Sequence, residues 1–391
     1  MSIRTRLLFI VFGFTLPALV GCRSTRYAIG DFLSPDWMTS QASREAYATY
    51  SNLAQRHIDQ ASQARADGDP QRALRHFRQA EVQFKKALDY DSYSLKAHLG
   101  AGFALFQQAA ELLRYRRNDD QQESIEKKCL EAIDYLEKAA DLRSGEWRVH
   151  YGLASAYRNL ATLAGVRLDR LEAASADPPL RDAEILTAQQ QRRSYLEHTL
   201  AEARRLQEVA PEQHQSYLLI GMTCANLQRY DEAIAHLEQW LTYARQTREV
   251  YEKWQQAGVL PRGVTGSRQE LEQKILTNRI RDAEARDALA SVYRARGDYA
   301  KALECLNAIY AINPGAPPRY LPARAWIKAR LGDYAGAVAD MDRFLSALRR
   351  AGREFDDDVR RAMEERDSYL AMSRGASPQS SALPEERPSN P

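Results

Sequence analysis

Residues 297–314 read GDYAKALECLNAIYAINP, and residues 332–348 repeat much of that pattern as GDYAGAVADMDRFLSAL. Gly297 and Gly332 are 35 residues apart, and the aspartate, tyrosine and alanines that follow them keep the same spacing. A period of roughly 20 to 50 residues is typical of proteins built from stacked structural repeats. The pattern therefore predicts an architecture of similar units packed side by side.

Each repeated unit is predicted to be two helices joined by a tight turn. Gly297 is able to adopt the left-handed conformation that ends a first helix, Asp298 is able to cap the second, and Pro314 ends it. Apolar residues on both sides of the turn recur three and four residues apart, the spacing of one helical face. They are Leu289, Ala290 and Tyr293 before the turn, and Ala302, Leu306 and Ile309 after it.

The composition also favours helix. The chain has 391 residues, with only 19 glycines, 15 prolines and 27% charged residues, and we find no alternating strand pattern. Its net charge is +3, of which Arg4 and Arg6 supply two, so there is no electrostatic reason to expect nucleic acid as a partner. The predicted fold class is all-α.

The repeats resemble the tetratricopeptide repeat (TPR) family, in which small residues stand where two helices cross and large apolar residues surround them. Further matches occupy residues 217–240 (Tyr217, Ile220, Gly221, Cys224, Tyr230, Ala233, Leu237, Trp240) and 318–350 (Ala325, Tyr334, Ala337, Met341, Phe344). Looser matches are Gly68, Ala73 and Phe77, then Leu99, Gly100 and Phe103, then Ala132, Leu136 and Ala139, and finally Leu153, Ala154 and Tyr157.

This resemblance implies an α-solenoid of stacked antiparallel helix pairs over residues 43–373, followed by a disordered tail at 374–391. A polar helix near its end, residues 353–372, is suited to covering the last apolar face. Insertions into the repeat pattern are expected near 112–127, 161–190 and 246–280. The last of these either extends the helices on both sides, with Ser267 and Glu270 spaced as a capping box, or is a degenerate repeat.

The N-terminus has the pattern of a secretory signal. Arg4 and Arg6 precede an apolar stretch from Leu7 to Val20, which is too short to span the ~30 Å core of a bilayer. Residues 19–22, LVGC, resemble the bacterial lipobox, in which the cysteine is the lipidated residue. The resemblance implies a signal peptide at 1–21 and an acylated Cys22 that begins a tether at 22–42; the alternative is an uncleaved apolar anchor with an incidental cysteine.

Lipidation of Cys22 would place the chain in the bacterial cell envelope. More than one acyl chain would attach it lastingly to a membrane, with the body of the protein in the periplasm. Arg23 stands where an aspartate resembles an inner-membrane retention signal, so the outer membrane is slightly favoured.

No enzyme signature is present in the sequence. The seven histidines are scattered, and there is no phosphate-binding loop, nucleophile elbow or paired cysteine motif. Cys129, Cys224 and Cys305 are far apart and are predicted to be buried thiols. The sequence therefore predicts no catalytic residue, no metal site and no cofactor.

The family resemblance implies a groove, lined by the first helix of each pair, that holds a peptide of a partner protein. The residues at the groove positions that we assign to peptide binding are Met222, Asn226, Arg294, Trp326 and Arg330. Residues 315–331 contain four basic residues and no acid, namely Arg319, Arg324, Lys328 and Arg330. This would make one end of the groove basic, unless these side chains form a solvated face.

Together these features predict a non-catalytic envelope lipoprotein that serves as a protein-protein interaction scaffold. The resemblance to repeat lipoproteins suggests a role in the assembly or recruitment of envelope proteins. The alternative is an accessory or catalytic envelope protein, associated with a hydrolase, that has an unrecognised site in one of the insertions.

Overall fold

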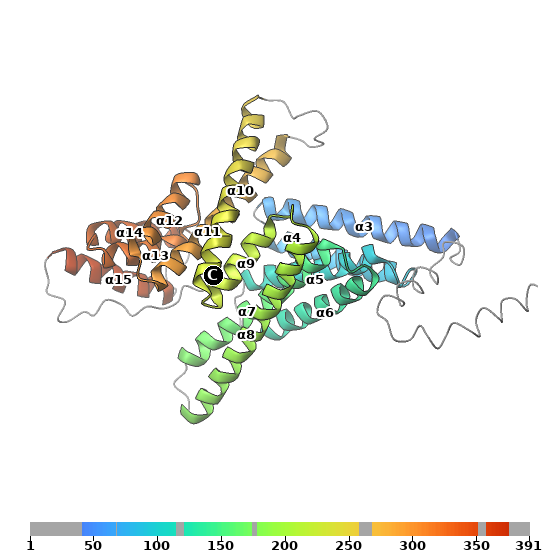
Figure 1. Cartoon of the computed structure of the whole chain (residues 1–391), viewed down its shortest axis with the longest axis horizontal. Coiled ribbons are helices and arrows are strands. Elements are labelled where there is room, and N and C mark those ends of the chain that lie inside the picture. The colour runs from blue at the N-terminus through green and yellow to red at the C-terminus, as the bar shows by residue number, and fades with distance from the viewer. Residues whose placement is uncertain are drawn as a thin grey trace, which may run out of the picture. The chain divides into compact units, whose positions relative to one another are not determined.

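The structure is a computed structural model of the chain, and it describes residues 41–67, 69–114, 121–173, 178–257, 268–350 and 357–374 (Figure 1). These residues form thirteen α-helices and one short 3-10 turn, with no strand among them. The predicted all-α fold of helix pairs is confirmed. The predicted signal peptide, Cys22 and the tail beyond residue 374 lie outside the described residues. Helix α3 begins at Gln41, so the last two residues of the predicted tether are helical.

The helices divide into two compact units, and the boundary falls between Pro211 and Glu212. The first unit contains three helix pairs: α3 (Gln41–Ala66) with α4 (Pro70–Leu88), α5 (Leu95–Arg114) with α6 (Gln121–Leu142), and α7 (Trp147–Ala173) with α8 (Pro178–Val209). Each helix packs against the next one in the chain, and the first helices of neighbouring pairs also touch. This is the stacking that the repeat pattern predicts.

The second unit continues the same scheme. Its pairs are α9 (Gln215–Asn226) with α10 (Tyr230–Ala257), α11 (Arg268–Ala295) with α12 (Tyr299–Ile312), and α13 (Leu321–Arg330) with α14 (Tyr334–Arg350). A 3-10 turn, η1 (Pro318–Tyr320), leads into α13, and a last helix, α15 (Asp357–Ser373), packs on α14. The first helices of the pairs in this unit are α9, α11 and α13.

The turns within the second-unit pairs share one hydrogen-bonding pattern. In each, a backbone N–H just after the first helix donates to the carbonyl five residues earlier: Arg229 to Cys224 at 2.8 Å, Asp298 to Tyr293 at 2.9 Å and Asp333 to Lys328 at 2.9 Å. The residue before each donor has a positive φ, with values of 60° at Gln228, 77° at Gly297 and 85° at Gly332. This is the motif that commonly ends helices, and it accounts for the repeated Gly-Asp in the sequence.

Small residues allow the helices of a pair to approach closely. A Cβ atom on Gly221 would lie 2.6 Å from Leu237 Cγ, and one on Gly102 would lie 2.7 Å from Leu136 Cγ. The loose match at Leu99, Gly100 and Phe103 predicted that Gly100 is the small residue of this crossing in α5, and that prediction is wrong. Gly100 instead faces the ring of Phe84 on the preceding helix, and Gly102 makes the close approach within the pair.

The predicted insertions fall mostly on extensions of long helices. Residues 161–173 and 178–190 belong to α7 and α8, and residues 246–257 and 268–280 belong to α10 and α11. In the described part of 246–280, both helices run without interruption. The described residues thus show an extended helix pair there.

The three described cysteines form no disulfide. Cys129 and Cys224 are fully buried, as predicted, whereas Cys305 is partly exposed. Burial raises the pKa of the Cys129 thiol to about 12 and that of Cys305 to about 11. Both side chains are therefore uncharged thiols at neutral pH.

Two buried histidines occupy equivalent places in α5 and α7 but differ in their partners. In each, Nε2 contacts the carbonyl six residues earlier, at 2.9 Å for His98 and 3.2 Å for His150. Nδ1 of His150 also lies 2.8 Å from the Glu202 carboxylate, which raises the pKa of His150. Nδ1 of His98 has no partner among the described residues, and burial lowers the pKa of His98.

We expect Gln228→Gly to stabilise the second unit. A left-handed conformation costs an ordinary residue ~1–2 kcal/mol, and the entropy that glycine adds to the unfolded chain offsets only part of that gain. The net increase in the free energy of unfolding should be about 0.5–1 kcal/mol, measured by urea denaturation. Gly297→Gln is the matched reverse change, because a Cβ there meets nothing within 4 Å. Gly297→Gln should lower the free energy of unfolding. An unchanged free energy of unfolding in either variant would contradict the role of the positive φ in this turn.

The two histidines should give stability opposite dependences on pH. The His150 contribution is present below its unfolded pKa of ~6.5 and is lost as pH rises through its higher folded pKa. The His98 contribution is present above ~6.5 and is lost as pH falls through its lower folded pKa. We expect His150→Gln and His98→Gln to change the slope of the urea midpoint against pH in opposite senses. If both substitutions changed this slope in the same direction, the contact of His150 with Glu202 would not be the cause of the difference between the two histidines.

Candidate partner-binding face of the second unit

One side of α11 presents a row of polar residues at helical spacing. Asp287, Ser291 and Arg294 are four and three residues apart, and all three are partly exposed. Because α11 is the first helix of its pair, this row lies where the sequence predicts the partner-binding surface. We use the term binding face for these three residues together with Trp326 and Arg330 of α13.

Trp326 is the centre of a cationic cluster on this face. The guanidinium carbon of Arg330 lies 4.8 Å from the centroid of the indole ring, and that of Arg294 lies 5.7 Å from it. Tyr299 meets the same ring edge-on at 5.7 Å. The structure therefore brings three of the five predicted residues together. It also shows that Trp326 is only 9% exposed, so the face presents guanidinium groups more than the ring.

The other two predicted residues, Met222 and Asn226, lie on α9. The Asn226 amide donates to the Met222 carbonyl at 3.0 Å, and Met222 packs on the apolar cluster that contains Leu218 and Leu289. Both side chains are partly exposed. The predicted site thus falls into two groups, and Tyr293 packs against the apolar clusters beneath both.

Two of the four predicted basic residues are used inside the fold. Arg324, 7% exposed, donates from Nε to Asp340 Oδ2 at 2.7 Å, and Lys328 lies 2.9 Å from the same oxygen. The expectation that all four cations form a basic groove end is therefore wrong. Asp340 is on α14, sixteen residues after Arg324, and no short-range motif in the sequence indicates this pairing.

Asp287 is the acidic member of the binding face. Burial raises the pKa of its carboxyl to about 6, although the positive charges of Arg319 and Arg294 act in the opposite direction. Arg319 itself donates to the Tyr320 hydroxyl at 2.6 Å. No hydrogen bond to the Asp287 carboxylate occurs within the described residues. Its carboxyl oxygens are able to accept hydrogen bonds from a ligand.

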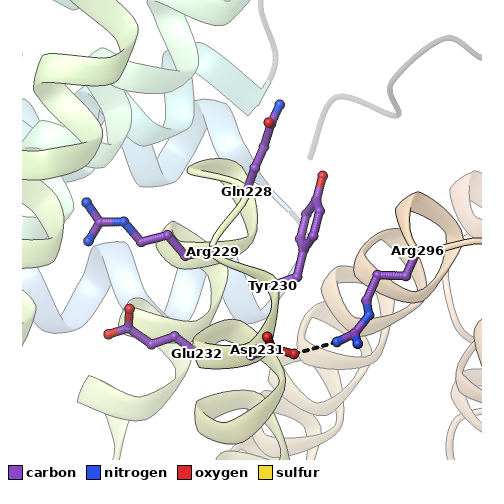
Figure 2. A pocket seen from close by; sticks show the side chains of 6 residues that line it. All are labelled: Gln228, Arg229, Tyr230, Asp231, Glu232 and Arg296. Atoms are coloured by element: carbon purple, nitrogen blue, oxygen red, sulfur yellow. Dashed lines mark hydrogen bonds and ion pairs between the residues drawn. The ribbon is translucent and has the colours of Figure 1, made fainter.

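An open hollow lies at the turn end of α9 and α11. Figure 2 shows its lining, in which Asp231 and Arg296 are joined by an ion pair of 2.6 Å. The other side chains that line it are Gln228, Arg229, Tyr230 and Glu232. None of these six is a predicted site residue, and the ion pair satisfies the two charges that face each other across the hollow.

The described residues contain no cluster of three or more His, Cys, Asp or Glu side chains placed to hold a metal ion. Among the helices in this part of the chain, none combines the length and the apolar character needed to cross a membrane.

Comparison with known proteins identifies two repeats in the second unit. A family model described as tetratricopeptide repeat matches residues 283–321, and another of the same description matches residues 214–247. No curated protein matches the chain.

Several solved structures are similar to this chain at low sequence identity. A thermophilic TPR protein of Thermus thermophilus is 17% identical, covers 67% of this chain and 93% of its own, and has a TM-score of 0.36. YrrB, a TPR protein with an unusual peptide-binding site, is 17% identical, with coverage of 71% and 94% and a TM-score of 0.31. The S. pombe nuclear import adaptor Nro1 is 14% identical, with coverage of 82% and 99% and a TM-score of 0.42.

The two matched segments contain α9, the first part of α10, the last part of α11 and α12, and both of these pairs show the shared turn. Repeats of this kind are typically non-catalytic and offer extended surfaces for binding other proteins. The chain therefore contains tetratricopeptide repeats at residues 214–247 and 283–321, and repeats of this family support a role as a protein-interaction scaffold.

Proposed function

We propose that this protein is a non-catalytic envelope lipoprotein that holds an acidic segment of a partner protein on the binding face. The observation that carries the proposal is the pair of guanidinium groups, Arg294 and Arg330, held on the single ring of Trp326. Stacking on an aromatic ring orients a guanidinium group, and for Arg330 it leaves the N–H edge available to a carboxylate.

Arg330 is the member of this pair that best suits a ligand. It is exposed, and no carboxylate forms an ion pair with it among the described residues. Arg324, in contrast, is buried and already neutralised by Asp340. A partner carboxylate would therefore find Arg330 oriented in advance and would displace only water from it.

The proposed attachment to the envelope is supported by residues 1–22. An acyl chain contributes ~0.8 kcal/mol for each methylene that it buries, so two or more chains on Cys22 would give lasting attachment. The scaffold would then act beside the membrane, in the periplasm and with the outer membrane favoured. Its role would be the assembly or recruitment of other envelope proteins.

We expect Arg330→Glu to reduce partner capture by about tenfold, because it replaces an attractive contact with repulsion of an acidic segment. A photo-crosslinking residue in place of Ser291 would report capture in intact cells. Arg343→Glu is a matched control, since Arg343 also lies over an aromatic ring, 5.6 Å from the centroid of Tyr310, but on α14. Trp326→Ala is unsuitable, because removal of a buried tryptophan costs ~3–5 kcal/mol of stability.

One dominant crosslinked protein that is lost in Arg330→Glu and kept in Arg343→Glu would agree with the proposal. Equal capture in wild type and Arg330→Glu would show that partners bind elsewhere.

We expect Cys22→Ser to move the protein from the membrane fraction to the soluble fraction, because the acyl chains would have no attachment point. Fractionation followed by immunoblotting measures this directly. Cys305→Ser is the control for loss of a thiol and should leave the distribution unchanged. Persistent membrane attachment of Cys22→Ser would contradict the lipoprotein assignment.

A further inference from the structure

We propose that the projecting ends of α10 and α11 extend the binding face and supply an apolar contact to the same partner segment, which binds in an extended conformation. We call these ends, residues 245–257 and 268–282, the arm. Figure 1 shows the arm as the part of this helix pair that projects beyond its neighbours in the second unit. The inference rests on the proposed function, since it describes the partner segment that the binding face would hold.

A single side of α11 carries both the arm contact and the binding face. Leu276 and Ile280 precede Asp287 by eleven and seven residues, and Arg294 follows Asp287 by seven. At ~100° per residue these four side chains lie within about 40° of one another around the helix. Leu276 and Ile280 are 42% and 43% exposed. The row of polar residues on α11 is therefore continued toward the arm by two exposed aliphatic side chains, Leu276 and Ile280.

The exposure of these two residues does not come from poor packing of the arm. Leu271 and Ile275, on the same helix, are each only 5% exposed. Two ion pairs also join the helices, with Arg248 donating to Asp282 at 3.1 Å and Arg279 to Glu252 at 3.1 Å. The arm thus has its own core and cross-links, and Leu276 and Ile280 are additional to them.

The distance between the apolar end and the cationic end of this row determines how far apart the apolar and acidic residues of the partner segment must be. Ile280 and Arg294 are fourteen residues apart in α11, which corresponds to ~21 Å. An extended segment covers that distance in about six residues. The partner segment would carry large apolar residues near one end and an acidic residue about six positions away.

An extended segment also suits the middle of the row better than a helix does. Asp287 accepts no hydrogen bond from the described residues, and Ser291 lies one turn further along α11. An extended backbone has N–H groups that are available to such a carboxylate, whereas those of a helix are used internally. The acidic end of the segment would face Trp326, because the exposed guanidinium group of Arg330 lies on that ring.

A library of random twelve-residue peptides, displayed on phage and selected on the full-length protein in detergent, tests this proposal. We expect the enriched peptides to share an acidic residue about six positions from large apolar residues. Synthetic copies should bind the double variant Leu276→Ser, Ile280→Ser about tenfold more weakly than wild type. Val250→Ser is the matched control: Val250 is 42% exposed on the arm, and it lies on the side of α10 opposite Arg248. It should bind like wild type.

The outcomes separate the arm from the binding face. Peptides that are weakened by Arg330→Glu but not by the double variant would overturn the arm and leave the proposed function standing. Peptides that respond to neither variant, or a selection without enrichment, would overturn both. Peptides that bind the double variant more weakly but bind Arg330→Glu like wild type would show that one segment does not contact both the arm and the binding face. Circular dichroism of each variant checks that its helix content is unchanged.

Discussion

The structure depends on one constraint, which is that a single helix pair leaves an apolar face uncovered and must be completed by its neighbour. The last pair of the second unit shows this directly. Ala325 and Ala329 of α13 share an apolar cluster with Met341 of α14 and with Tyr369 of α15, and Tyr369 is 0% exposed. The polar helix expected to cover the last apolar face is thus largely α15. Without α15, one side of that cluster would be exposed to water.

Local features of the chain could be predicted well because their causes are local. The turn at Gly297 needs a positive φ and a cap within a few residues, and both requirements are met by adjacent letters of the sequence. Gln228 shows that the same turn forms without glycine, since its backbone adopts φ 60°. The register of α5 could not be predicted, for the opposite reason. Gly100 and Gly102 are equally small, and only their neighbours Phe84 and Leu136 decide which one lies within the pair.

The candidate site could be predicted in part. The family resemblance placed Arg294, Trp326 and Arg330 on one surface, but it did not indicate that both guanidinium groups would lie over the indole ring. That arrangement depends on the distance between α11 and α13, which packing sets. The pairing of Arg324 and Lys328 with Asp340 could not be foreseen either, because a net count of charges in one segment ignores carboxylates on the next helix.

The position of Arg330 differs from that of the arginines that form ion pairs inside the fold. Arg324 meets a carboxylate on the following helix, and the buried Glu111 of α5 likewise meets Arg65 of α3. A buried charge needs such a partner, because leaving it unpaired in a medium of low polarity is costly. Arg330 is under no such requirement, since it is exposed. It nevertheless lies on Trp326, whose ring Tyr299 contacts from another side.

A guanidinium group held in this way has lost part of its rotational freedom before any ligand arrives. A ligand that binds it therefore loses less conformational entropy than one that must first order a mobile arginine. Stacking uses the face of the guanidinium plane and not its N–H edge, so a carboxylate is able to approach Arg330 along that edge. The fold thus separates the cations that stabilise it from those that it holds ready at the surface. Arg330 on Trp326 belongs to the second group, which is why we place recognition there.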